Sequence, residues 1–87
     1  MVTENQNKLM LMIKNGDFKT LSDYFDKTKW RAELVSQMAD EFKWLHRNNF
    51  IFFNGTSKYG PYSDNIPIYY SAWKLTSRGL RALKDRT

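Results

Sequence analysis

The sequence predicts one α+β domain over residues 1–87, and three observations support that class. Residues 3–48 hold three segments with helix-capping residues and apolar side chains spaced three and four apart. Two aromatic and β-branched segments, 50–53 and 66–75, flank a loop rich in glycine, serine and asparagine. A threonine-capped basic segment follows the second one. The predicted order is therefore three helices, a β-hairpin of two or three strands, and a C-terminal helix.

The first predicted helix begins at a capping box and ends at a glycine. Thr3 and Gln6 stand at the spacing where a hydroxyl and a side-chain amide each satisfy a free backbone group. We expect the helix to run to about Asn15, with Gly16 just past its end. Its predicted buried residues are Leu9, Met12 and Ile13.

The second predicted helix is short. Thr20 and Asp23 repeat the capping pattern and are expected to start it. Its predicted inward residues are Leu21, Tyr24 and Phe25.

The third predicted helix is the longest, from Trp30 to Asn48, and Asp26 or Thr28 can cap it. We expect Trp30 in the core or at its edge, since it is in register with the buried stripe. Asn48 and Asn49 are expected to end the helix because asparagine tolerates positive φ. The apolar stripe comprises Trp30, Leu34, Val35, Met38, Phe42 and Leu45, and the opposite side carries Glu33, Ser36, Gln37, Asp40, Lys43 and Arg47.

The hairpin is predicted from alternation of side chains. Phe50 to Phe53 forms the first strand, and Asn54-Gly55 opens a loop that extends to about residue 66. Thr76 is expected to cap the last helix, with Leu80 and Leu83 buried. In the return strand, Tyr69, Ser71, Trp73 and Leu75 are expected on one face and Ile68, Tyr70 and Ala72 on the other.

Charge is distributed unevenly along the chain, whose net charge is +5. Residues 1–42 carry six Lys/Arg and seven Asp/Glu, giving −1, whereas residues 43–87 carry eight Lys/Arg and two Asp, giving +6. The excess therefore lies on the hairpin and the last helix. It favours an anionic partner, DNA first and then RNA or an acidic protein, although it is also compatible with a solubilising surface.

Several classes of protein are disfavoured by what the chain lacks. There is no cysteine, so disulfides and thiolate metal sites are excluded, and the single histidine, His46, is expected on the surface. No Ser–His–Asp spacing or phosphate-binding glycine loop is present, so we expect no catalytic residue, metal or cofactor. No apolar run approaches roughly 18 residues, and the segment MVTENQNK does not have the form of a signal peptide. We expect a cytoplasmic protein without a membrane partner.

Two motifs give the chain a resemblance to a known family. LHRNNFI at 45–51 ends a helix and starts a strand, and WKLTSRGL at 73–80 is similar to the aromatic-x-Leu-Thr-x-x-Gly pattern that closes the wing in many bacterial and phage regulators. With the preceding helices, the chain resembles the winged helix-turn-helix superfamily over nearly its whole length. Asn49 stands where many members have glycine. The resemblance implies a three-helix core, a β-hairpin wing at about 54–66, and a small regulator of transcription or replication.

The resemblance also implies a way of binding double-stranded DNA. The third helix would enter the major groove, where Arg can bind guanine and Gln adenine, and the wing would follow the phosphate backbone. The start of the second helix would anchor a further phosphate. The predicted DNA-binding residues are Lys19, Thr20, Lys29, Arg31, Ser36, Gln37, Lys58, Tyr59, Lys74 and Arg78.

Three alternatives remain open at this stage. Glu33 and Asp40 make the exposed side of the third helix nearly neutral, which favours a winged helix that binds a protein instead of DNA. The tyrosines at 59, 62, 69 and 70 are typical of single-strand or RNA binders, but they also suit cross-strand packing. The apolar run from Leu9 to Ile13 is wider than one core face needs and supports a homodimer.

Overall fold

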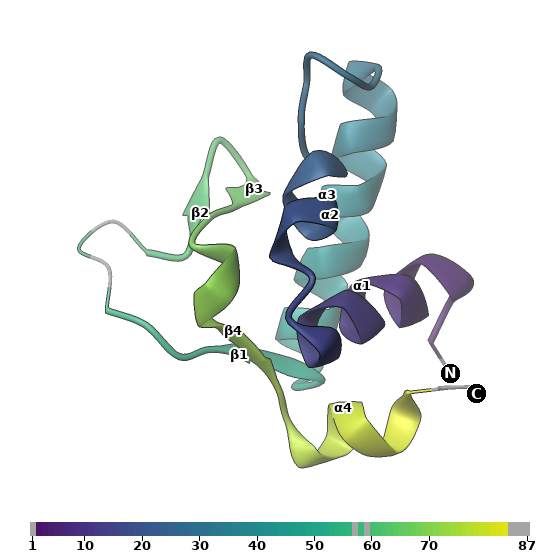
Figure 1. Ribbon diagram of the computed structural model, residues 1–87, viewed down its shortest axis with the longest axis vertical. Helices are drawn as coiled ribbons and strands as arrows, with labels where there is room; N and C mark the ends of the chain where they lie inside the picture. The colour runs from purple at the N-terminus through teal and green to yellow at the C-terminus, as the bar shows by residue number, and fades with distance from the viewer. Residues whose placement is uncertain (1, 57, 59, 84–87) are drawn as a thin grey trace.

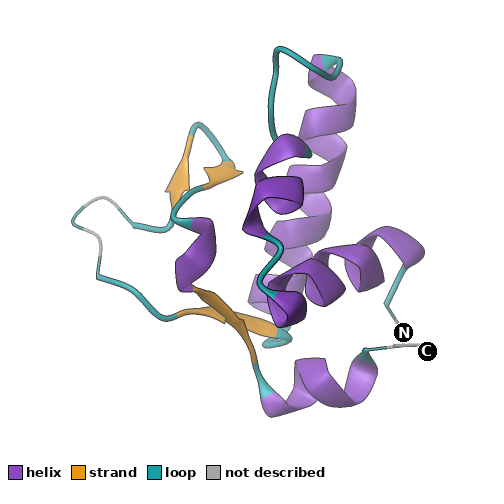
Figure 2. Cartoon of the chain, in the orientation of Figure 1, coloured by secondary structure: helices purple, strands orange, loops and turns teal. Residues whose placement is uncertain are grey.

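The computed structural model describes residues 2–56, 58 and 60–83, and it confirms the α+β class. The helices α1, α2 and α3 pack together, and the strand pair β1/β4 closes the base of the molecule, next to α4 (Figures 1 and 2). A second strand pair, β2/β3, lies beside α3. The elements are α1 (Glu4–Asn15), α2 (Phe18–Asp23), α3 (Ala32–Arg47), β1 (Ile51–Phe53), β2 (Tyr62–Ser63), β3 (Ile66–Pro67), the 3-10 helix η1 (Tyr70–Ala72), β4 (Trp73–Leu75) and α4 (Ser77–Ala82).

The predicted limits of α1 are confirmed, but the predicted start of α2 is wrong. Thr3 and Gln6 form the capping box, and Gly16 adopts a left-handed conformation with φ of 70°. The N-cap of α2 is Asp17, whose carboxylate accepts a hydrogen bond from the Thr20 backbone N–H at 3.4 Å. Because Asp17 directly follows the terminator of α1, the cap forms three residues earlier than predicted.

The beginning of α3 also differs from the prediction. Asp26 accepts hydrogen bonds from the Thr28 backbone N–H at 2.9 Å and from its hydroxyl, so both predicted caps belong to a turn before the helix. The N-cap is Arg31, which has no side-chain capping bond. Trp30 and Leu34 are 44% and 45% exposed, so their predicted burial is wrong. The first turns of α3 extend beyond α1 and α2, where little of the described chain covers them (Figure 1).

The predicted return strand is interrupted. β2 and β3 form a small hairpin whose turn residues Asp64 and Asn65 both have positive φ, as a type I′ turn requires. Tyr69 then takes φ of 53°, and η1 follows before the chain becomes extended again. The predicted two-face alternation therefore does not hold between residues 68 and 72. In β4 it returns: Lys74 faces outward opposite Phe52, while Trp73 is fully buried.

Trp73 is the centre of the core. Its ring meets Phe42 edge-on at 4.7 Å and packs against Phe53 at 5.2 Å between ring centroids. Its indole N–H donates to the Ile68 carbonyl at 3.0 Å, so the buried polar atom is satisfied. The stripe of α3 that was predicted to be buried is confirmed at Val35, Met38, Phe42 and Leu45.

The two sequence motifs meet at one junction. Asn49 has φ of 64°, which ends α3 and turns the chain into β1. Thr76 caps α4 as predicted, and its hydroxyl also donates to the carbonyl of Asn49. Gly79 is buried against Phe50, and a Cβ at this position would lie 2.1 Å from the Phe50 carbonyl oxygen. Only glycine fits, so the motif residues fasten α4 to the end of α3.

The predicted burial in α4 is half right. Leu80 is 52% exposed, because the side of α4 that faces the core is occupied by Gly79. Leu83 is half-buried and packs against the core as expected.

Candidate nucleic-acid interface

The predicted phosphate anchor at the start of α2 is already occupied by a carboxylate. Lys19 and Thr20 are exposed there. The Thr20 backbone N–H, however, bonds to Asp17. An acidic cap at that position opposes a second anion, so the geometry weakens this part of the predicted site.

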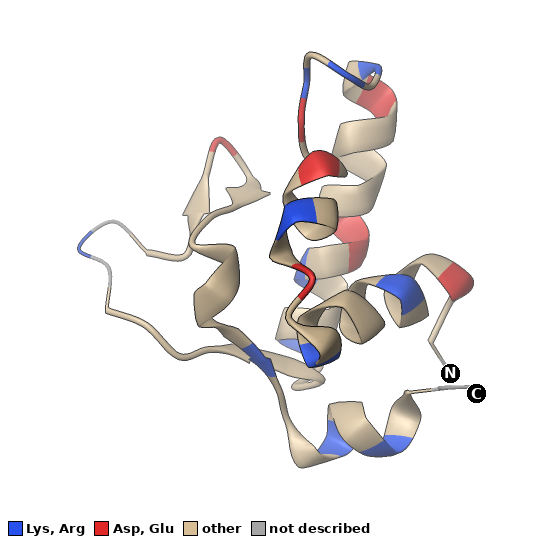
Figure 3. Cartoon of the chain, in the orientation of Figure 1, with Lys and Arg blue, Asp and Glu red and all other residues tan. Residues whose placement is uncertain are grey.

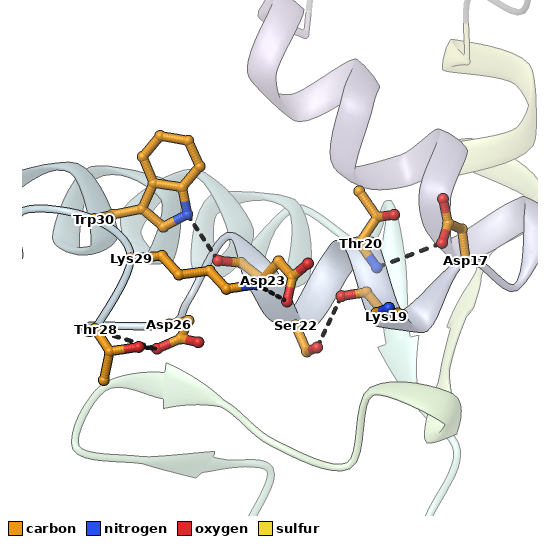
Figure 4. Close-up of polar contacts among 9 residues, drawn as sticks. All are labelled: Asp17, Lys19, Thr20, Ser22, Asp23, Asp26, Thr28, Lys29 and Trp30. Atoms are coloured by element: carbon orange, nitrogen blue, oxygen red, sulfur yellow. Dashed lines mark hydrogen bonds and ion pairs between the residues drawn. The ribbon is translucent and has the colours of Figure 1, made fainter.

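Lys29 and Arg31 lie around the start of α3. The Lys29 ammonium is 3.1 Å from the Asp23 carboxylate, and both side chains are about half exposed (Figure 4). Such a pair contributes little to stability, and Lys29 can exchange Asp23 for another anion. Arg31 is exposed at the N-cap.

The predicted base-reading residues of α3 lie on two sides of the helix. Ser36 lines a cleft of about 350 Å³ between α3 and the hairpin turn at Asp64 and Asn65. Gln37 instead lines a groove of about 180 Å³ beside Trp30. The structure therefore does not bring Ser36 and Gln37 together in one cavity.

The predicted wing residues lie on different elements. Lys58 is exposed, and Tyr59 lies outside the described residues. Lys74 is exposed on β4, where it pairs with the half-exposed Phe52. The Arg78 guanidinium lies over the Phe50 ring at 4.6 Å, a cation–π contact that holds it at the start of α4.

The β2/β3 hairpin is attached to α3 by contacts that the sequence analysis did not predict. The Lys43 ammonium donates to the Asn65 side chain at 3.0 Å. His46 Nδ1 is 2.8 Å from the Tyr62 hydroxyl, and the imidazole packs edge-on against Trp73. His46 is therefore half-buried, not a surface residue as expected. Burial lowers the pKa of His46 and raises the pKa of Tyr62 to about 12.

Four exposed basic side chains lie at one end of the molecule. The described residues Arg47, Lys74, Arg78 and Arg81 are all exposed, and we call them the basic surface. They belong to adjacent elements: α3 contacts β1, β1 pairs with β4, and β4 contacts α4. β1, β4 and α4 contain no acidic residue, whereas the acids of α3 lie before its last turn and a half (Figure 3). Arg47 and Arg81 were not predicted as site residues; the charge of residues 43–87 was the signal for them.

Other kinds of site find little support among the described residues. In that part of the chain, no group of three His, Cys, Asp or Glu side chains could hold a metal ion. Over the same residues, no helix is long and apolar enough to cross a bilayer.

Comparisons with known proteins find no similar protein. Neither protein-family models, nor curated proteins, nor solved structures give a match to this chain. The arrangement of its own residues is therefore the basis for a functional proposal.

Proposed function

We propose that this chain is a winged-helix domain that binds double-stranded DNA, as a small regulator of transcription or replication. The order of three helices, an antiparallel strand pair and a capped helix supports the fold. The loop between β1 and β4, which includes the β2/β3 hairpin, takes the place of the wing. One observation carries the binding proposal: the basic surface places four exposed cations on α3, β4 and α4, and neither β1, β4 nor α4 contains an acid.

Phosphate contacts are assigned to the C-terminal end of α3 and to the elements that follow it. Glu33 and Asp40 are exposed on the earlier turns of α3 and would repel a phosphate brought close to them. Arg47, Lys74 and Arg78 lie away from those two acids. The phosphate contacts therefore lie at the end of α3, on β4 and on α4, and they fix the position of the duplex.

Base reading is the part of the proposal that rests on α3 itself. Arg31 is the exposed side chain best suited to a guanine edge, and Gln37 can bind adenine. Selection from a randomised duplex pool tests this role. Arg31→Ala should relax the selected motif while leaving affinity for random duplex nearly unchanged. Equal losses on selected and random duplex would reject base reading by Arg31.

Salt dependence tests the basic surface. Binding to a random duplex is measured by fluorescence anisotropy at several salt concentrations, for the parent chain and for the double variant Lys74→Gln/Arg81→Gln. Removing one phosphate contact should reduce the slope of log K against log salt by roughly 0.9. The matched control, Lys8→Gln/Lys27→Gln, removes the same charge from exposed lysines of α1 and the loop before α3.

The control variant distinguishes binding through the basic surface from a general attraction by the net charge of the chain. The proposal requires the slope to fall in the Lys74/Arg81 variant and to stay unchanged in the Lys8/Lys27 variant. Equal reductions would mean that net charge alone attracts DNA. Absence of duplex binding by the parent chain at low salt would reject DNA binding and favour the protein-interaction alternative.

A further inference from the structure

Phe52 places an exposed aromatic ring beside a cation of the basic surface. The side chain is 41% exposed on β1, and Lys74 of β4 is its direct cross-strand partner. Partners of this kind project from the same face of a sheet, with Cβ atoms roughly 4.5–5.5 Å apart. The opposite face carries Ile51 and Trp73, which are both buried. The outer face of the β1/β4 pair therefore presents a flat ring next to a lysine side chain.

The fold itself does not require a ring at this position. Phe50 stacks on Trp44 with centroids 5.4 Å apart. Phe53 packs against Trp73 at 5.2 Å between centroids. Within the described part of the chain, Phe52 makes no ring pair and no cation–π contact, and it does not pack against the core. Because valine or threonine would suit a strand equally well, the ring is left available for a ligand.

The charges near the ring select an anionic partner. Asp64 is the only acidic residue between positions 43 and 84. It lies in the turn of the β2/β3 hairpin, where it lines the cleft beside α3. The exposed cations on the elements adjacent to β1 are Arg47, Lys74, Arg78 and Arg81. A phosphate group can pair with these cations, whereas a cationic partner would be repelled by them.

Among anionic partners, a single free ring favours a nucleic-acid base. An anionic bilayer binds helices that bury a wide apolar face in it, and one ring on a strand of three residues does not supply such a face. A nucleotide offers a phosphate to Lys74 and a flat base to Phe52, the combination that single-strand binders use. In an intact duplex each base is stacked between its neighbours, so the ring reaches a base only where the strand is unpaired.

We infer that Phe52 stacks on an unpaired base of bound DNA, with Lys74 on the adjacent phosphate. The inference rests on the proposed DNA binding, and it adds that the preferred ligand is a duplex with an unpaired nucleotide next to it. It differs from stacking on the tyrosines. Tyr62 is hydrogen-bonded to His46, and Tyr69 lies near Phe53, which belongs to the other face of β1.

Fluorescence anisotropy with three labelled probes tests the inference. The first is a blunt duplex of random sequence, and the second is the same duplex extended by a short single strand of thymidines. The third carries abasic sites in that extension, which keep the phosphates but remove the bases. The parent chain should bind the thymidine extension about tenfold more tightly than the abasic one, a typical effect of stacking one base on an aromatic ring.

Three variants assign this discrimination to the ring. Phe52→Leu should bind the thymidine and abasic extensions equally and keep its affinity for the blunt duplex, whereas Phe52→Tyr should discriminate like the parent chain. The matched control is Tyr69→Leu, which removes a ring that is 58% exposed elsewhere and should also discriminate like the parent. Circular dichroism checks that each variant is folded. If Phe52→Leu does not fold, Phe52→Ile replaces it, because a β-branched side chain suits a strand.

The outcomes separate this inference from the proposed function. A parent chain that binds the blunt duplex but does not discriminate between the two extensions would overturn the inference and leave DNA binding intact. Discrimination that Phe52→Leu retains, or that Tyr69→Leu loses, would overturn it as well. If the parent chain binds none of the three probes at low salt, both proposals fail, and an acidic protein becomes the partner to test.

Discussion

Gly79→Ala is the substitution for which the structure makes its sharpest prediction. In an ordinary helix, alanine is more favourable than glycine by about 1 kcal/mol. At residue 79, however, the added Cβ would lie 2.1 Å from the Phe50 carbonyl oxygen and 3.1 Å from its carbon. Both are backbone atoms, so no side chain can rotate to relieve the clash, and α4 must move away from the chain at the end of α3.

The magnitude follows from what that movement breaks. The Thr76 backbone N–H donates to the Phe50 carbonyl at 3.1 Å, and the Thr76 hydroxyl donates to the Asn49 carbonyl at 2.5 Å. Two hydrogen bonds contribute about 1–3 kcal/mol together. Displacing Leu83 from the core costs about 1 kcal/mol more, since it is only half-buried. After the gain in helix propensity, we expect a net loss of about 1–3 kcal/mol in the free energy of unfolding.

Urea denaturation followed by circular dichroism measures that loss, and thermal denaturation gives a second reading. A loss of about 1 kcal/mol lowers the melting temperature of a domain of this size by roughly 4–8 °C. The control is Leu80→Ala in the same helix, where an exposed side chain is shortened and stability should change by less than about 0.5 kcal/mol. A Gly79→Ala variant as stable as the parent chain would refute the close packing of α4 on Phe50.

Three further predictions test other local features. Burial lowers the pKa of His46 in the folded chain, so just below the ordinary pKa of 6.5 the imidazole takes up a proton in the unfolded chain but not in the folded one. The free energy of unfolding should therefore fall as pH decreases below 6.5, and His46→Gln should remove this fall in denaturation experiments. Burial raises the pKa of Tyr62 to about 12, so the last step of a tyrosine absorbance titration should disappear in Tyr62→Phe; persistence of that step would mean that another phenol ionises last. Asn49 has φ of 64°, so Asn49→Ala should cost about 1 kcal/mol in urea denaturation while Asn49→Gly should be neutral or better; equal stability of the two variants would contradict the left-handed turn.

The features that could be predicted from sequence are those set by a few neighbouring residues. The capping box at Thr3, the stop at Gly16, the turn at Asn49 and the cap at Thr76 each depend on one side chain and the backbone within a few positions. Their energies do not depend on how the elements pack, so the pattern alone was enough. Gly79 shows the limit, because its place in the motif was visible but the Phe50 oxygen that makes glycine necessary was not.

The features that were missed depend on which element covers which. Spacing predicts one apolar stripe along α3, but it cannot show that the first turns extend past α1 and α2 and leave Leu34 exposed. Likewise, alternation predicts one long return strand. In the structure, however, Tyr69 adopts positive φ, and the Trp73 indole N–H donates to the Ile68 carbonyl across this interruption. Both the exposure of Leu34 and the interruption of the return strand depend on contacts between segments far apart in the sequence.

For the candidate site too, the sequence predicted the composition of the surface but not the relative positions of its residues. The sequence indicated an excess of cations after residue 42, and the structure shows four of them exposed on adjacent elements. It could not indicate that Ser36 and Gln37 face different cavities, or that Asp17 caps the helix expected to anchor a phosphate. These facts require the relative positions of α2, α3 and the hairpin.

The separation of charge along α3 has two causes that can be distinguished. Glu33 in its first turn and Arg47 in its last suit the helix dipole, so the fold alone favours them. Arg81 suits the dipole of α4 in the same way, because it lies in the last turn of that helix. Lys74 lies on β4, where no helix dipole accounts for it, so Lys74 supplies the strongest argument for an anionic ligand.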